Sequence, residues 1–215
     1  MIRAVPPPEG TSGPSLAGVL DGFRYATSRQ ELVGTYVVDF VAMVFGMPLA
    51  LFPAIADRLG GPRILDLLYA APAVGALVAS LTSRWTPRVH RHGRAVLAAA
   101  AAWGLAIVAF GFCDRFPFAL GFLVLADAVS GLFRMTIWNQ TIPDDLRGRL
   151  ASIEIVSYTS GPLLGHAEAG AAAALGGVRF SVVSGGALCV VGVVACALLL
   201  PGFLAYDARA CRSRA

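Results

Sequence analysis

Lysine is absent from this sequence, and charge of either sign is scarce. All 17 basic residues are arginine, and charged residues make up 14% of the 215 positions, against 57% for apolar ones. Soluble domains carry about 25% charged and roughly 45–50% apolar residues. This shortage of charge, with a mean hydropathy of +0.71, excludes a disordered chain, a coiled coil and an ordinary water-soluble enzyme. It predicts an all-α membrane protein with room for six transmembrane helices of about 20 residues each.

Cysteine pairs and enzyme motifs are missing as well. The four cysteines include no CxxC pair, which excludes the usual spacing of a zinc site or a thioredoxin motif. The sequence has no HExxH, P-loop or GxGxxG motif. A GxSG serine-protease motif fails around Ser160, because Tyr158 stands where that motif has glycine. We therefore predict no enzyme activity and no bound cofactor or metal.

What the sequence does contain is six apolar segments between two polar ends. Residues 1–30 form a cytoplasmic Pro- and Gly-rich lead-in that ends in an amphipathic segment. Residues 31–207 form the six-helix transmembrane bundle, and residues 208–215 form a cytoplasmic Arg-rich tail. The predicted spans cover residues 32–53, 64–81, 95–113, 116–138, 150–175 and 180–206. Because proline removes a helical hydrogen bond, kinks are expected within spans at Pro48, Pro53, Pro72 and Pro162.

The distribution of arginine predicts how these spans are oriented. Six spans place both termini on one side, and a cytoplasmic assignment gives that side thirteen of the 17 arginines. The opposite side keeps four: Arg58, Arg63, Arg115 and Arg179. Since cytoplasmic loops are enriched in basic residues, we expect a multi-pass protein in contact with lipid in a bacterial inner membrane, with both termini cytoplasmic. The arginines are scattered through short loops, so no nucleic-acid partner is predicted.

Five charged residues within the predicted spans are candidates for a substrate or proton pathway. A charge inside a membrane costs a few kcal/mol on insertion scales, so it is expected to face the protein interior or water. The candidates are Asp39, Asp127, Arg134, Glu154 and Glu168. Asp127 and Arg134 are seven residues apart and share one helix face, and Glu154 shares a face with Glu168. Other interpretations stay open, because Arg134 can extend to the interface, Glu154 can be a solvated helix-start acid, and Glu168 can make a structural hydrogen bond.

A cytoplasmic charge cluster precedes the fifth predicted span. Asp144 and Asp145 suit a helix N-terminus, where the helix dipole favours negative charge. Arg147 and Arg149 follow at the membrane face. These four side chains can form a charge latch, and ordinary anchoring of a span by positive charge is the alternative interpretation.

Several segments in order resemble the C-terminal half of major facilitator superfamily transporters. The resemblance is to the branch of the enterobactin exporter and related bacterial drug and siderophore efflux proteins, and it covers residues 17–207. It rests on VDFVAMVFGMPLALFPAIA, LLYAAPAVGALVAS, GRAVLAAAAAWGLAIVAFGF, FRMTIWNQTIPDDLRGRLASIE and GPLLGHAEAG. It implies one six-helix half of a twelve-helix fold that works by alternating access. It also implies export of a small molecule, such as a siderophore or a drug, against proton entry.

The resemblance leaves two interpretations open, because only one half of that fold is present. In the first, the chain is half of an antiporter and works with a second six-helix half or as a homodimer, since substrate sites in such folds lie between repeats. In the second, it is a truncated, non-transporting remnant or the mis-called start of a full twelve-helix exporter. A membrane enzyme is the third class, and the failed motif searches count against it.

Overall fold

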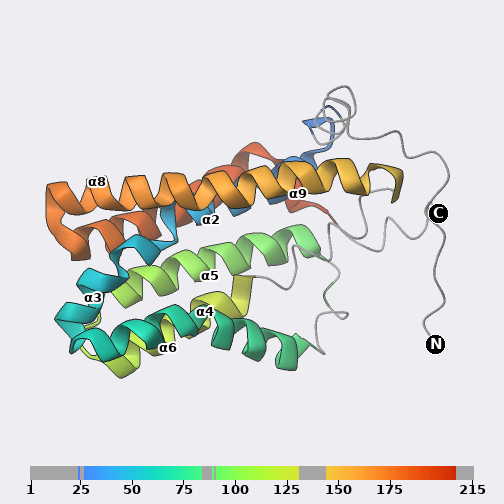
Figure 1. Cartoon of the computed structure of the whole chain (residues 1–215). Coiled ribbons are helices and arrows are strands. Elements are labelled where there is room, and N and C mark those ends of the chain that lie inside the picture. Colours follow the sequence, from blue (N-terminus) through green and yellow to red (C-terminus); the bar gives the residue numbers. More distant parts are fainter. Residues whose placement is uncertain (1–23, 25–26, 84–88, 90, 131–143, 207–215) are drawn as a thin grey trace.

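The computed structural model describes residues 24, 27–83, 89, 91–130 and 144–206, and all regular secondary structure in these ranges is helical. The predicted all-α class is therefore confirmed (Figure 1). The helices are α2 (Gln30–Phe45), the 3-10 helix η1 (Pro48–Leu51), α3 (Phe52–Leu59), α4 (Pro62–Thr82), α5 (His92–Phe112), α6 (Phe116–Ser130), α8 (Asp144–Leu199) and α9 (Pro201–Leu204).

Glycine and proline set several of the helix boundaries. Helix α3 ends at Leu59, and the two glycines that follow, Gly60 and Gly61, have φ values of 142° and 96°. Pro62 then opens α4, where its missing N–H costs no helical hydrogen bond. Pro48 opens η1, so the first predicted span is divided into α2, η1 and α3. The expected kink at Pro48 is thus present as a break in the helix.

Helix α8 is two helical arms joined by a sharp turn at Gly177. Gly177 has φ 84° and ψ 169°, a conformation that side-chain-bearing residues rarely adopt. The Ser181 hydroxyl donates to the Ala169 carbonyl across this turn at 2.8 Å, and Figure 1 shows the chain reversing there. The turn falls in the predicted gap between the fifth and sixth spans. The second arm, 178–199, and the apolar part of the first arm, 155–176, are each about 33 Å long at 1.5 Å per residue, which matches the thickness of a bilayer core.

Helix α5 lies in the middle of the molecule. It packs against α6 on one side and against the second arm of α8 on the other, while α4 packs on α6 and α2 contacts both arms of α8 (Figure 1). The helices approach closely where glycines meet, since a Cβ on Gly104 of α5 would lie 3.0 Å from the Gly186 carbonyl oxygen of α8. Small residues of this kind allow close helix packing in membranes.

Four helical segments among the described residues are long and apolar enough to cross a membrane. They are Leu32–Leu59, Pro62–Thr82, His92–Phe112 and Ile155–Leu199, with mean hydropathies from 1.8 to 2.5. The last one includes the reversal at Gly177, and Phe116–Ala128 is a shorter apolar helix. Large apolar side chains are widely exposed, as for Leu175 at 88% and Leu198 at 77%. These features fit an all-α membrane protein, and the count of six spans stays a prediction.

Candidate functional site

A cavity of about 230 Å³ lies between four of the helices. Its wall combines α2, α5, α6 and the first arm of α8. Among the residues that the structure describes, the lining consists of Thr35, Val38, Asp39, Ala42, Met43, Met47, Val96, Ala100, Trp103, Asp127 and Tyr158. Pockets that enclose a small-molecule ligand usually measure roughly 300–1,000 Å³, so this cavity is smaller than a typical complete ligand site.

Two carboxylic acids line this cavity from different helices. Asp39 comes from α2 and Asp127 from α6, and both side chains are half-buried. Neither acid is without an interaction partner. Most of the other lining residues are apolar, and charges interact more strongly in such surroundings than in water. The cavity therefore combines groups that can exchange protons with apolar walls that can hold an amphipathic molecule.

The position of Asp127 depends on a close contact between α4 and α6. A Cβ on Gly75 of α4 would lie 2.5 Å from the Asp127 Cβ and 2.7 Å from the Val124 carbonyl oxygen. Any larger residue at Gly75 would push α4 away from α6 at this level. The glycine therefore lets α4 support the helix that carries Asp127.

Aromatic and sulfur-containing side chains form much of the rest of the wall. The Trp103 indole Nε1 donates a hydrogen bond to the Gly46 carbonyl oxygen at 3.0 Å. Met43 is packed against Gly161 of α8, where an added Cβ would meet the Met43 side chain at 3.0 Å. Tyr158 reaches the cavity from the same arm of α8. These polarizable groups suit ligands of varied shape.

The structure brings together two of the five predicted pathway residues, Asp39 and Asp127. Glu168 is half-buried on the first arm of α8 and does not line this cavity. Arg134 lies outside the described residues. Glu154 and the predicted cytoplasmic cluster fall in residues 144–154, where the helix backbone is described but the side chains lie outside the description; that cluster is Asp144, Asp145, Arg147 and Arg149. The functional roles of all these residues stay predictions.

Sequence reasoning did not single out Trp103, Met43 or Met47. Each sits in a mostly apolar segment, where an aromatic or sulfur side chain is more often a packing residue. The one available signal was Gly46-Met47-Pro48, because proline interrupts a helix and frees backbone groups that need new partners. That signal indicates a break but does not say which residue supplies the partner.

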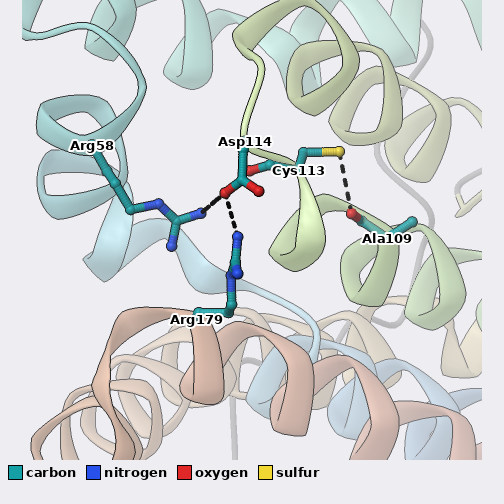
Figure 2. A network of polar contacts seen from close by, with 5 residues as sticks. All are labelled: Arg58, Ala109, Cys113, Asp114 and Arg179. Carbon is teal, nitrogen blue, oxygen red and sulfur yellow. Dashed lines mark hydrogen bonds and ion pairs between the residues drawn. The ribbon is translucent and has the colours of Figure 1, made fainter.

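A second polar group, shown in Figure 2, lies at the end of the bundle where α8 reverses. The Asp114 carboxylate, between α5 and α6, pairs with Arg179, which follows the Gly177 turn. It also pairs with Arg58 of α3 at 3.9 Å. We call these three residues the Asp114 cluster. The Arg58 guanidinium also donates to the Cys113 carbonyl oxygen at 3.3 Å, so the cluster joins α3, the connection between α5 and α6, and the start of the second arm of α8.

The neighbouring thiol responds to this arrangement. Partial burial, and secondly the Asp114 charge, raise the pKa of the Cys113 thiol above its ordinary value. Asp114 itself is 74% exposed. Arg58 and Arg179 are two of the four arginines predicted to lie on the non-cytoplasmic side.

Comparison with known proteins adds the functional context. The chain is similar to curated enterobactin exporters. It is 28% identical over 201 residues to Enterobactin exporter EntS of Escherichia coli O81, and 29% identical over 206 residues to Enterobactin exporter EntS of Citrobacter koseri. These matches confirm the resemblance seen in the sequence, and their names describe exporters rather than enzymes. No family model and no solved structure matches the chain.

The matches cover a much larger share of this chain than of the exporters. They include 90% and 92% of this chain, but only 48% and 49% of the two exporters. The chain thus spans about half the length of the curated relatives it matches.

Proposed function

We propose that this chain is one six-helix half of a proton-coupled efflux transporter in a bacterial inner membrane. Its substrate would be a small amphipathic molecule, siderophore-like or drug-like. The observation that carries the proposal is the cavity in which Asp39 and Asp127 meet an apolar, aromatic wall. The similarity to enterobactin exporters supports export as the direction of transport.

A second body completes the transporter in this proposal. The curated relatives are about twice as long as the matched region, and the cavity is smaller than a typical ligand site. Substrate sites of many transporters lie at the interface of two repeats, and alternating access moves one repeat against the other. One half supplies one wall of such a site. The other wall would come from a separate six-helix half or from a second copy of this chain.

The six spans of the proposal combine the four apolar segments with the features described above. The two arms of α8 count as two spans, because each is long enough to cross the bilayer core. The apolar helix Phe116–Ala128 counts as one more. With both termini cytoplasmic, the Asp114 cluster lies on the periplasmic side.

Reconstitution tests the transport proposal. The full chain is placed in vesicles with a proton gradient, with and without the candidate first half, and flux of a catecholate siderophore and of a lipophilic fluorescent dye is measured. We expect proton-dependent flux only when a second half or a second copy is present. Robust transport by a demonstrated monomer would contradict the half-transporter proposal. Absence of flux under every condition, with both proteins folded, would instead favour a non-transporting remnant.

Reporter fusions test the orientation. Alkaline phosphatase, which is active only in the periplasm, is fused after Arg58 and after Arg91. High activity is expected at the first position and background activity at the second. The reverse pattern would overturn the proposed topology.

A further inference from the structure

The first apolar span is interrupted near its middle. Helix α2 ends at Phe45, Gly46 and Met47 have non-helical backbone angles, and η1 begins at Pro48. Gly46 is the fifteenth of the 28 residues in Leu32–Leu59, so the break lies near the centre of this span. Backbone polar groups at this depth need protein partners, because the bilayer core offers no water.

Trp103 supplies one of these partners from the neighbouring helix. Because Pro48 has no N–H, the regular helical hydrogen bond to the Val44 carbonyl cannot form across the break. Two residues further on, within the break, the Gly46 carbonyl accepts a hydrogen bond from the Trp103 indole N–H at 3.0 Å. The geometry is close, since a Cβ on Gly46 would lie 2.6 Å from the indole Nε1. Glycine and tryptophan therefore fit each other at this point.

The indole is itself held in place. Trp103 is half-buried on α5, the middle helix, and packs against both apolar clusters of the molecule. One cluster contains Phe52 and Ile107, and the other contains Val193 and Phe203. A side chain fixed on both sides is a rigid support for whatever its N–H binds.

The break and its support lie at the wall of the candidate site. Met43 precedes the break, Met47 is part of it, and both line the cavity together with Trp103. We propose that Trp103 is a positioning residue: its indole N–H holds the interrupted middle of the first span and thereby sets the shape of the cavity wall. The effect of this positioning on transport rests on the proposed function. The claim that Trp103 supports the cavity wall does not depend on it.

An isosteric replacement separates this role from simple packing. β-(3-Benzothienyl)alanine has nearly the shape of tryptophan but carries sulfur in place of the indole N–H. If Trp103 only fills space, Trp103→β-(3-benzothienyl)alanine will behave like the native chain. If the hydrogen bond positions the wall, the substituted chain will keep its fold, but the backbone at Gly46 and Met47 will become more mobile.

The readout is the reactivity of a cysteine placed in the break. Met47→Cys is combined with Cys113→Ser and Cys211→Ser, while Cys189 and Cys196 are left because they are 0% and 4% exposed. Labelling by a water-soluble maleimide is measured on the full chain in vesicles, so the result does not depend on any substrate. We expect labelling to become about fivefold faster with the isostere, the factor that corresponds to about 1 kcal/mol for a neutral hydrogen bond.

Two further variants complete the test. A cysteine at exposed Asp57 of α3 is the matched control, and its labelling rate is expected to stay constant. Gly46→Ala is expected to raise labelling at position 47 strongly beside Trp103, and less in a Trp103→Phe background, where the new methyl group meets no indole. An unchanged rate with the isostere, equal effects of Gly46→Ala in both backgrounds, or failure of the isosteric chain to fold would each overturn the positioning role.

Discussion

The central cavity and the Asp114 cluster place carboxylates in opposite surroundings. Asp39 and Asp127 are half-buried in a mostly apolar wall, whereas Asp114 is 74% exposed between two arginines. Interactions of exposed charges are weakened by water and salt, and exposed ion pairs contribute about 0–1 kcal/mol. The same residue type therefore has different consequences in the two places. In the cavity it is a group that can exchange protons, and at the surface it links separate segments of the chain at a small gain in stability.

The largest expected effect comes from neutralising the cavity acids. Asp39→Asn and Asp127→Asn remove the carboxyl groups that we propose exchange protons, while keeping similar shapes. In the vesicle assay we expect each variant to lower proton-driven flux at least tenfold, which corresponds to an increase of about 1.4 kcal/mol or more in the transport barrier. Asp57→Asn, at an exposed position on α3, is the matched control. Flux close to that of the native chain in both cavity variants would remove the acids from the mechanism.

The next effect concerns the support of Asp127. Gly75→Ala places a methyl group 2.5 Å from the Asp127 Cβ, and overpacking of this kind costs about 1–3 kcal/mol. Thermal unfolding in detergent is expected to shift down by several degrees. Gly121→Ala on α6 has no atom within 4 Å of the added group, and alanine favours helix over glycine, so this control should hold or raise the melting temperature. Equal shifts in the two variants would show that the close contact at Gly75 does not constrain α4.

A smaller effect is expected at the surface cluster. Asp114→Asn removes both ion pairs, and the free energy of unfolding should fall by about 1 kcal/mol or less. The difference should shrink further in about 1 M salt, where screening is strong. Urea unfolding monitored by circular dichroism at two salt concentrations measures this. A loss of stability that is large and independent of salt would show that the Asp114 ion pairs are not screened by solvent, which would contradict the contrast with the cavity acids.

The smallest expected effect is a change in thiol reactivity without a change in fold. Because the Asp114 carboxylate contributes to the raised pKa of the Cys113 thiol, Asp114→Asn should lower that pKa. More thiolate then forms at a given pH, and alkylation of Cys113 by iodoacetamide should become faster on the alkaline side of neutrality. Partial burial remains in the variant, so its pKa should stay above the ordinary thiol value. A reactivity profile that does not move would show that burial alone sets this pKa.

The sequence was most informative where a residue differs sharply in polarity or conformational freedom from the apolar residues around it. Asp39 and Asp127 stand out as acids in apolar segments, and the structure brings them into one cavity. The gap between the fifth and sixth predicted spans likewise falls on the Gly177 turn, because glycines and Arg179 interrupt the apolar run there. Local contrast of this kind needs no knowledge of tertiary structure.

Residues whose role depends on another helix could not be predicted in the same way. Trp103 acts on a carbonyl 57 positions away, and nothing in its own segment identifies that partner. Glu168 has the same local signature as Asp39, yet it does not line the cavity, since the rotation of a helix about its axis is set by packing. The Asp114 cluster requires α3, the connection between α5 and α6, and α8 to meet at one end of the bundle.

The second arm of α8, which follows the turn at Gly177, also limits where residues can be inserted into or deleted from the chain. A single inserted or deleted residue in the second arm of α8 would rotate every later residue of that arm by about 100°. Gly185 and Cys189, which face α2 and α5, would then point elsewhere. Substitutions at exposed positions such as Leu188 and Val191 leave this register unchanged. Related sequences should therefore differ in this arm by substitution, and carry insertions and deletions outside it.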